Sequence, residues 1–265
     1  MTSVENITDS LFLTTVDPAK EEGPSEQYIA TSIMFTVGMC GLIANMTAIR
    51  VVWKSKNLHN CFGYLLLLHA SAEALVLCSF IFWAVPTTLF DRYLPKTTLG
   101  LKIGQLLMIF YYATLYAQLF KAINRFVAIF SPIIYRRWFS DENSKFVLLA
   151  VIFFSLLHGI LYFFPGCNFY YDGDEFGWVY DDTPCYDVMA IYVDFIIGCS
   201  IMGITMFIDT YLKMTSVENI TDSPFVTTVY PKDKEGPSEQ YVATFLMFTM
   251  ATCGLIANMT AIRII

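Results

Sequence analysis

Apolar runs dominate the chain, and they are too long to be core helices of a water-soluble domain. Of its 265 residues, 56% are hydrophobic and only 15% are charged. A helix that spans the hydrocarbon core of a bilayer needs roughly 20 mostly apolar residues. Runs of that length lie at about 28–53, 62–90, 100–130, 146–165, 187–212 and 241–264. The sequence therefore predicts an all-α, polytopic helix bundle in the lipid bilayer.

The last of these runs copies the first. Aligned without gaps, residues 1–52 and 214–265 are identical at 38 of 52 positions, and both segments begin with MTSVENITDS. The predicted bundle thus contains five distinct helices plus a sixth that repeats the first one. We expect four parts along the chain: a tail at 1–27, five helices at 28–212, a repeated tail at 213–240 and a repeated first helix at 241–265.

The placement of basic residues predicts the orientation of the chain. Lys and Arg residues near helix ends are retained in the cytoplasm. If the first tail lies outside, eight of them face the cytoplasm and only Lys20, Arg92, Lys96 and Lys102 face outward. The inner eight are Arg50, Lys54, Lys56, Arg125, Arg136, Arg137, Lys145 and Lys213. We therefore expect a multi-pass protein of the plasma membrane with an extracellular N-terminus, glycosylated at Asn6 within the sequon Asn-Ile-Thr.

Two of the seven cysteines lie in the outer segment between the fourth and fifth helices. Cys167 and Cys185 would face an oxidising compartment, where disulfides form. We expect these two residues to be bridged, which would stabilise the loop by roughly 3 kcal/mol in the chain-entropy model. The other cysteines lie in or beside the helices, where a free cysteine is most often a small buried hydrophobe.

Ionisable and polar side chains inside the predicted helices indicate which faces turn away from lipid, because such groups are costly in hydrocarbon. Steps of three and four residues along the third helix define one stripe: Gly104, Leu107, Tyr111, Thr114, Gln118, Lys121 and Arg125. The stripe predicts either the wall of a cavity or ordinary packing between helices. Our candidates for lining a ligand cavity are Leu107, Met108, Tyr111, Thr114, His158 and Asp194.

Three further polar residues lie in the first two helices. His69 and Glu73 are four residues apart and share a helix face, so they can contact one another. This pair is either a proton or cation site or a structural contact. Asn45 lies on a face with Gly38 and Gly41, which favours close packing against another helix.

Motifs for several other functions are missing from the sequence. It contains no phosphate-binding glycine loop, no HExxH or CxxC metal motif and no GxSxG nucleophile elbow. It also has no basic stripe of the kind that binds nucleic acid. We therefore expect neither an enzyme nor a protein that carries a metal or a cofactor.

A set of short motifs resembles one receptor family. Asn124, Arg125 and Phe126 end the third helix, and Pro132 and Tyr135 follow. The other matching stretches are GLIAN at 41–45, FGYLLLLHA at 62–70, WAVP at 83–86, GQ at 104–105 and PGCNFYYD at 165–172. Together they resemble the nematode serpentine chemoreceptors of class x (Srx), which are rhodopsin-like G-protein-coupled receptors. The resemblance covers residues 28–212.

The resemblance implies a seven-helix receptor whose outer half binds a small-molecule chemical ligand and whose inner ends contact a heterotrimeric G protein. Arg125 would gate G-protein engagement, with Asn124 and Phe126 beside it. Pro132 and Tyr135 would belong to the second intracellular loop. Asn124 stands where the wider superfamily has an acidic residue, so the resemblance does not imply the usual lock between an acid and the arginine in the resting state.

The restart at Met214 departs from the family pattern, which continues after the fifth helix into a sixth and a seventh. We expect a truncated receptor fused to the opening of a tandem copy, unable by itself to activate a G protein. Two alternatives are a regulatory partner of an intact receptor and a transporter unrelated to signalling.

Overall fold

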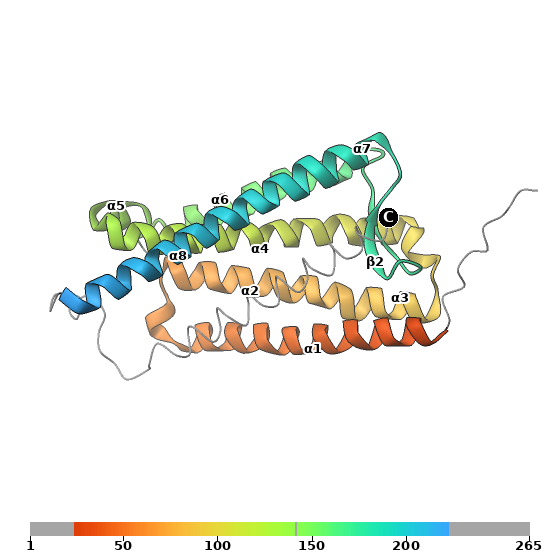
Figure 1. Ribbon diagram of the computed structural model, residues 1–265, viewed down its shortest axis with the longest axis horizontal. Coiled ribbons are helices and arrows are strands. Elements are labelled where there is room, and N and C mark those ends of the chain that lie inside the picture. The colour runs from red at the N-terminus through yellow and green to blue at the C-terminus, as the bar shows by residue number, and fades with distance from the viewer. Residues whose placement is uncertain (1–23, 141, 223–265) are drawn as a thin grey trace, which may run out of the picture.

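The computed structural model is a bundle of long helices with a small β-hairpin at one end (Figure 1). It describes residues 24–140 and 142–222. The helices in this part of the chain that are long and apolar enough to cross a membrane are Glu26–Lys54, Cys61–Phe90, Thr98–Phe130, Ser144–Phe163 and Pro184–Thr215. The predicted all-α membrane bundle is thus confirmed for five helices. The expected sixth helix and Asn6 lie outside the described residues.

The five spans are built from the following elements. The first is α1 (Pro24–Lys54), and the second comprises α2 (Cys61–Ser79), the π-helix η2 (Phe80–Ala84) and α3 (Val85–Phe90). The third is α4 (Thr98–Phe130), and the fourth comprises α6 (Ser144–Gly159) and the 3₁₀ turn η4 (Ile160–Phe163). The fifth comprises α7 (Pro184–Tyr186), the π-helix η5 (Asp187–Ile197) and α8 (Gly198–Asp222). Short connectors are η1 (Lys56–Leu58), η3 (Leu94–Lys96) and α5 (Pro132–Trp138).

Helix α4 forms the centre of the bundle, because it packs against α2, α6 and α8 (Figure 1). Its buried side chains include Leu107, Tyr112 and Ala117. Helix α1 lies at the edge and packs on α2, with large apolar side chains such as Ile33 and Ile43 exposed on its outer face. Exposed apolar side chains on a long apolar helix are what contact with lipid requires.

A hairpin closes the end of the bundle at which α1 begins. Strand β1 (Phe169–Asp172) pairs antiparallel with β2 (Gly177–Tyr180). The hairpin lies directly on α4, because a Cβ atom at Gly104 would be 1.8 Å from the carbonyl oxygen of Phe169. We call this end of the bundle the hairpin end, and the opposite end, where α5 lies, the α5 end (Figure 1).

The fifth span is longer than its apolar run. Its last helix, α8, continues to Asp222, ten residues beyond the predicted end at 212, and so includes the first nine residues of the repeat. The sequence from 213 to 222 contains neither Gly nor Pro, the two residues that most disfavour a helix, and Pro224 follows. The polarity of this segment therefore does not end the helix.

The π-helical turn η2 in the second span has a local cause. It comes just before Pro86, which has no backbone N–H and so cannot donate to the preceding turn. A wider π turn is one way in which a helix accommodates such a break. The aromatic ring of Phe80, at the start of this turn, packs edge-on against Trp178 of the hairpin, with ring centroids 6.1 Å apart.

Candidate functional site

One carboxylate joins three of the spans in the half of the bundle nearer the hairpin. Asp194 lies in the π-helix η5, and its Oδ1 atom accepts hydrogen bonds from two tyrosine hydroxyls. One comes from Tyr112 of α4 and the other, at 2.5 Å, from Tyr162 of η4. Both tyrosine side chains are fully buried. The carboxylate is therefore held at the meeting point of the third, fourth and fifth spans.

Aromatic rings surround this carboxylate. The His158 ring stacks on Tyr112, with ring centroids 4.8 Å apart, and its Nδ1 is 2.7 Å from the Tyr116 hydroxyl. The Tyr180 ring of β2 stacks on Tyr162 at 6.2 Å. We call these six residues the Asp194 cluster: Asp194, Tyr112, Tyr116, His158, Tyr162 and Tyr180. Its members come from α4, α6, η4, η5 and the hairpin.

The six residues predicted to line a ligand cavity are divided between different places. Asp194 and His158 belong to the cluster, and Tyr111 packs edge-on against Tyr112 at 5.6 Å. Leu107 and Met108 lie in the apolar core, each only 5% exposed.

The remaining candidate, Thr114, lies in another contact. Its carbonyl oxygen is 3.1 Å from Nδ1 of His69.

The tyrosines that touch Asp194 are not those that the stripe on the third helix indicates. Tyr112 follows Tyr111 by one residue and therefore points about 100° further round the helix. The sequence does contain a sign of the second face: Tyr112 and Tyr116 are four residues apart and therefore lie on the same side of the helix. Tyr162 carries no comparable signal, because it lies in a short 3₁₀ turn at the end of an apolar run.

A second polar group lies between α2 and α4. Nε2 of His69 is 3.3 Å from Oε2 of Glu73, so the two residues predicted to share a face are in contact. Lys121 of α4 is only 8% exposed, and none of the ion pairs in residues 24–140 and 142–222 includes it. Asn45 is buried in α1, where its Nδ2 donates to the Gly41 carbonyl at 3.1 Å.

Arg125, near the α5 end of α4, is paired with an acidic residue of the fifth span. Its Nη2 is 2.7 Å from Oδ1 of Asp209 in α8. Asn124 is buried, and its Nδ2 has no hydrogen-bond partner among the described residues. Asp209 is not among the residues predicted from the sequence, although an ionisable residue in an apolar span needs a partner, and this applies to Asp209 as well as to Asp194.

The chain around α5 carries the other residues of the predicted G-protein motif. The rings of Phe126 and Phe130 pack in a tilted arrangement, with ring centroids 4.7 Å apart. Pro132 is the first residue of α5, and the Tyr135 ring stacks on Phe139 at 5.8 Å. Helix α5 also exposes large apolar and basic side chains: Ile133, Ile134, Arg136, Arg137 and Trp138.

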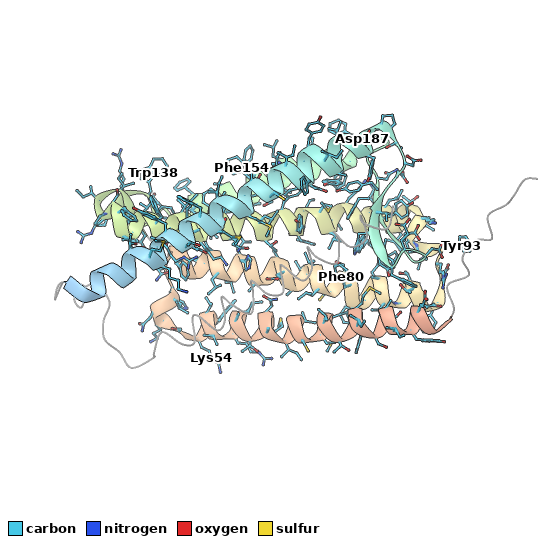
Figure 2. All side chains as sticks on the ribbon, in the orientation of Figure 1. Lys54, Phe80, Tyr93, Trp138, Phe154 and Asp187 are labelled. Carbon is cyan, nitrogen blue, oxygen red and sulfur yellow. A yellow bond between two sulfur atoms is a disulfide. The ribbon has the colours of Figure 1, made fainter. Side chains whose placement is uncertain are left out.

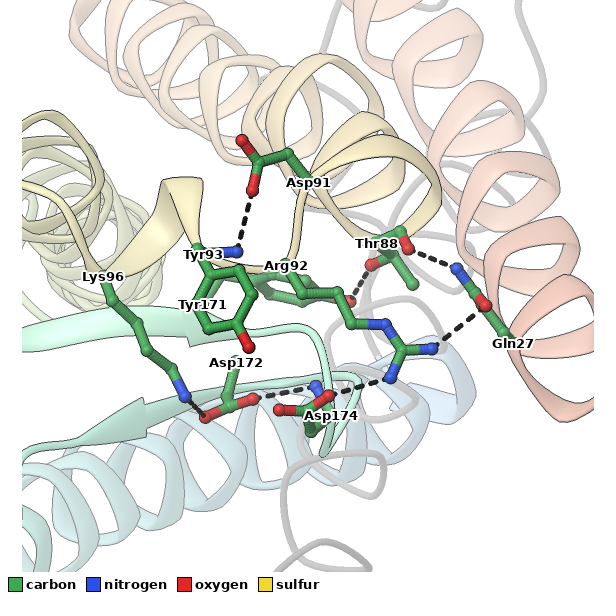
Figure 3. Close-up of polar contacts among 9 residues, drawn as sticks. All are labelled: Gln27, Thr88, Asp91, Arg92, Tyr93, Lys96, Tyr171, Asp172 and Asp174. Carbon is green, nitrogen blue, oxygen red and sulfur yellow. Dashed lines mark hydrogen bonds and ion pairs between the residues drawn. The ribbon is translucent and has the colours of Figure 1, made fainter. Parts of the chain in front are cut away.

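Polar contacts hold the hairpin to the neighbouring helix ends (Figure 3). Arg92 pairs with Asp174 at 2.8 Å and donates to Gln27 of α1 at 3.0 Å. On the other side, Lys96 pairs with Asp172 at 3.1 Å, and this hydrogen bond raises the pKa of Lys96. These contacts connect the hairpin with α1 and with the loop between the second and third spans.

Buried and covalent contacts complete this attachment. The Tyr171 hydroxyl is 2.7 Å from Thr88 Oγ1, and burial raises the pKa of Tyr171 to about 12. Cys167 and Cys185 form the predicted disulfide, with Cα atoms 5.3 Å apart, which ties the hairpin to the start of the fifth span.

The arrangement defines a class of protein. Five helices long and apolar enough to cross a membrane, with a disulfide-tied hairpin over one end, define a multi-pass membrane protein. The family model of the serpentine type 7TM GPCR chemoreceptor Srx matches residues 35–222. The chain therefore belongs to this chemoreceptor family.

A comparison with one receptor of Caenorhabditis elegans shows what fraction of that receptor this chain covers. The chain is 23% identical over 209 residues to Serpentine receptor class X 45 of that nematode. The aligned part is 77% of this chain and 58% of the relative. The chain thus spans less than two thirds of the length of that protein.

Proposed function

We propose that the chain is part of a chemosensory receptor, in which the Asp194 cluster receives a small-molecule ligand from outside the cell and the α5 end contacts a heterotrimeric G protein. Membership of the chemoreceptor family supports the general role. The observation that carries the proposal is the placement of two polar sites on the single helix α4. Tyr112 faces the Asp194 carboxylate in one half, and Arg125 pairs with Asp209 in the other.

Charge at the two ends supports an extracellular hairpin. Lys54 and Trp138 lie at the α5 end, whereas Tyr93 and Asp187 lie at the hairpin end (Figure 2). Basic residues close to the α5 end are Lys54, Lys56, Arg136, Arg137 and Lys145. The turn of the hairpin carries Asp174 and Glu175, and basic flanks stay in the cytoplasm. The α5 end then faces the cytoplasm, where G proteins are found.

Exposed side chains on α5 support a protein contact there. Ile133 is 86% exposed and Trp138 is 65% exposed, beside Arg136 and Arg137. Aromatic residues and arginine are enriched at the centres of protein interfaces. The ion pair between Arg125 and Asp209 lies at the same end of α4 and engages the arginine that the family resemblance assigns to G-protein gating.

Photo-crosslinking tests the G-protein contact without requiring a known ligand. A photoreactive benzoylphenylalanine would replace Ile133 in the full chain, expressed in cells that contain heterotrimeric G proteins. We expect ultraviolet light to attach a G-protein α subunit to this position. The matched control carries the same group at Glu175 in the hairpin, where no attachment is expected. Equal capture at both positions, or none at 133, would contradict the proposed contact.

We further propose that the repeat arose when a truncated receptor was joined to the first part of a neighbouring tandem copy, by gene duplication or in a gene model. The identity of residues 1–10 and 214–223 supports this origin, because the second copy repeats the first from its methionine onward. Long-read sequencing of transcripts from the source tests it. Transcripts from two adjacent genes, with reads rarely crossing the junction of Lys213 and Met214, would identify a joined gene model. Abundant crossing reads would show instead that the fused chain is expressed.

A further inference from the structure

We propose that the Asp194 cluster selects a positively charged organic ligand of the protonated-amine class. The proposal rests on the proposed function, because it specifies the chemistry of the ligand that the receptor site would take. It is carried by the charge, the hydrogen bonds and the surroundings of a single carboxylate.

Asp194 has no cationic partner in the described chain, whereas Asp172, Asp174 and Asp209 each pair with a lysine or an arginine. Glu73 contacts His69, and Asp209 pairs with Arg125. At the hairpin end, Asp172 and Asp174 pair with lysine and arginine. None of these ion pairs involves Asp194, although it lies within an apolar span, where an uncompensated charge is costly. A cationic ligand would supply the missing charge.

The basic residue Lys102, near the hairpin end of α4, is engaged elsewhere. The Lys102 ammonium donates to Gln105 Oε1 at 2.9 Å and lies over the ring of Phe163 at 5.0 Å from its centroid. Gln105 in turn donates to the Tyr162 carbonyl. Lys102 is thus held beside the cluster without pairing with its carboxylate.

The hydrogen bonds of Asp194 leave one acceptor open. Tyr112 and Tyr162 both donate to Oδ1. Within residues 24–140 and 142–222, no hydrogen bond reaches Oδ2. An ammonium group has only donors to offer, so it matches an open carboxylate oxygen. Hydrogen bonds between charged groups are roughly twice as strong as neutral ones.

The aromatic rings of the cluster also suit a cation. The rings of Tyr112, Tyr162 and Tyr180 lie around the carboxylate, with Tyr162 and Tyr180 stacked. The face of an aromatic ring attracts a cation, and the attraction strengthens when water is excluded. An anionic ligand would be repelled by Asp194, and a neutral one would leave its charge without a partner.

The backbone at this position is also unusual. Asp194 lies in the π-helix η5, which runs over 11 residues. π-Helical segments occur mostly as short bulges and are frequent at functional sites. The wider turn changes the direction of the side chains along the fifth span relative to a regular helix, and Asp194 then meets both tyrosines.

Three probes of similar size but different charge test the proposal. The full chain, in nanodiscs of phosphatidylcholine, is titrated with phenethylamine, 2-phenylethanol and phenylacetate, and binding is followed by saturation-transfer NMR. We expect the amine to bind roughly tenfold or more tightly than the alcohol, since a hydrogen bond to a charged group has that strength. Phenylacetate should bind most weakly.

Variants test whether the Asp194 carboxylate causes the preference for the amine. Asp194→Asn should bring the affinity for the amine down to that for the alcohol, whereas Asp174→Asn on the exposed hairpin should keep the tenfold preference. If Asp194→Asn fails to fold, the comparison of the three probes on the unmodified chain still decides whether a cation is preferred.

The outcomes separate the two proposals. Equal binding of amine and alcohol by the unmodified chain, or tighter binding of phenylacetate, would overturn the cation preference and leave the receptor proposal standing. A preference that survives in Asp194→Asn would overturn the assignment to this carboxylate. If none of the three probes binds, the amine proposal falls, while the crosslinking at residue 133 tests the receptor proposal separately.

Discussion

The partner of Arg125 comes from another helix and not from its own neighbour. Asn124 cannot neutralise the guanidinium, and the carboxylate of Asp209 in α8 does so at 2.7 Å. The pair therefore connects the third and fifth spans close to the end where the G-protein contact is proposed. Any movement of α8 away from α4 would have to separate these two charges.

A double-mutant cycle measures the coupling energy between Arg125 and Asp209. Both side chains are about one third exposed, so we expect Arg125→Gln and Asp209→Asn to couple by only about 0.5–1 kcal/mol in thermal unfolding. Arg136, exposed on α5, serves as the control, and Arg136→Gln should show no coupling with Asp209→Asn. Coupling of equal size for both arginines would show that the effect is long-range rather than a specific pair.

The contact between Lys96 and Asp172 predicts a loss of stability at alkaline pH. The hydrogen bond to Asp172 raises the pKa of Lys96 in the folded state. Such a group stabilises the fold below its unfolded pKa of about 10.4, and the contribution disappears as pH rises through the higher folded value. We therefore expect the melting temperature of the unmodified chain to fall as the pH rises above about 10.4.

A variant isolates the contribution of lysine. Tyr171, with its pKa raised to about 12 by burial, also loses its stabilising protonated form in the alkaline range. Lys96→Met should therefore show a smaller fall in melting temperature than the unmodified chain, with a remainder from tyrosine. Identical pH profiles for the two proteins would exclude a role of Lys96.

At the scale of single residues, the sequence identifies the groups that need partners better than the partners themselves. It indicates Asp194, His158 and the pair of His69 and Glu73, because charge in an apolar helix stands out. It does not indicate Tyr162, because a tyrosine at a helix end is common in any membrane protein. Which ring meets Asp194 depends on helix rotation, and the π-helix η5 changes that rotation.

Among the elements, the contact of the hairpin with α4 depends on a glycine. A side chain at Gly104 would overlap the backbone of Phe169. We expect Gly104→Ala to destabilise the protein by about 1–3 kcal/mol, because β1 would have to move. The control is Gly203→Ala in α8, where the added methyl meets nothing within 4 Å and helix propensity favours alanine by about 0.5–1 kcal/mol. Equal unfolding temperatures for the two variants would contradict the close contact at Gly104.

The disulfide gives a second prediction for the hairpin. Cys167 and Cys185 are 18 residues apart in sequence and tie the hairpin to the fifth span. Replacing both by serine should lower the free energy of unfolding by about 2–4 kcal/mol. Cys199→Ser serves as the control, since Cys199 is free and exposed, and it should leave unfolding nearly unchanged. Unfolding temperatures unaffected by the double replacement would show that the bridge is not needed for stability.

Elements follow the sequence closely where a long apolar run defines them. The predicted run at 100–130 corresponds to α4, Thr98–Phe130, because hydrophobicity and helix length agree. The hairpin was not predicted, because strands of four residues are too short to show a recognisable alternation of apolar and polar residues. The end of α8 at Asp222 was not predicted either, because the helix ends according to helix propensity and not where the polar residues begin.

At the scale of the whole molecule, the helix bundle and the family membership define the architecture. The proposed role of each site depends in addition on which end of the bundle faces outward. The Asp194 cluster can receive an external chemical only if the hairpin end faces outward. The α5 end can meet a G protein only if it faces the cytoplasm. Both proposals therefore depend on the same topology, which basic residues at the α5 end favour.

Labelling of introduced cysteines tests that topology most directly. Glu175→Cys in the hairpin and Arg136→Cys in α5 are expressed separately in cells and treated with a maleimide that cannot cross membranes; the unmodified chain gives the background from its own cysteines. We predict that residue 175 is labelled in intact cells and that residue 136 is labelled only after the membrane is permeabilised. Labelling of residue 136 in intact cells, with residue 175 protected, would contradict the account.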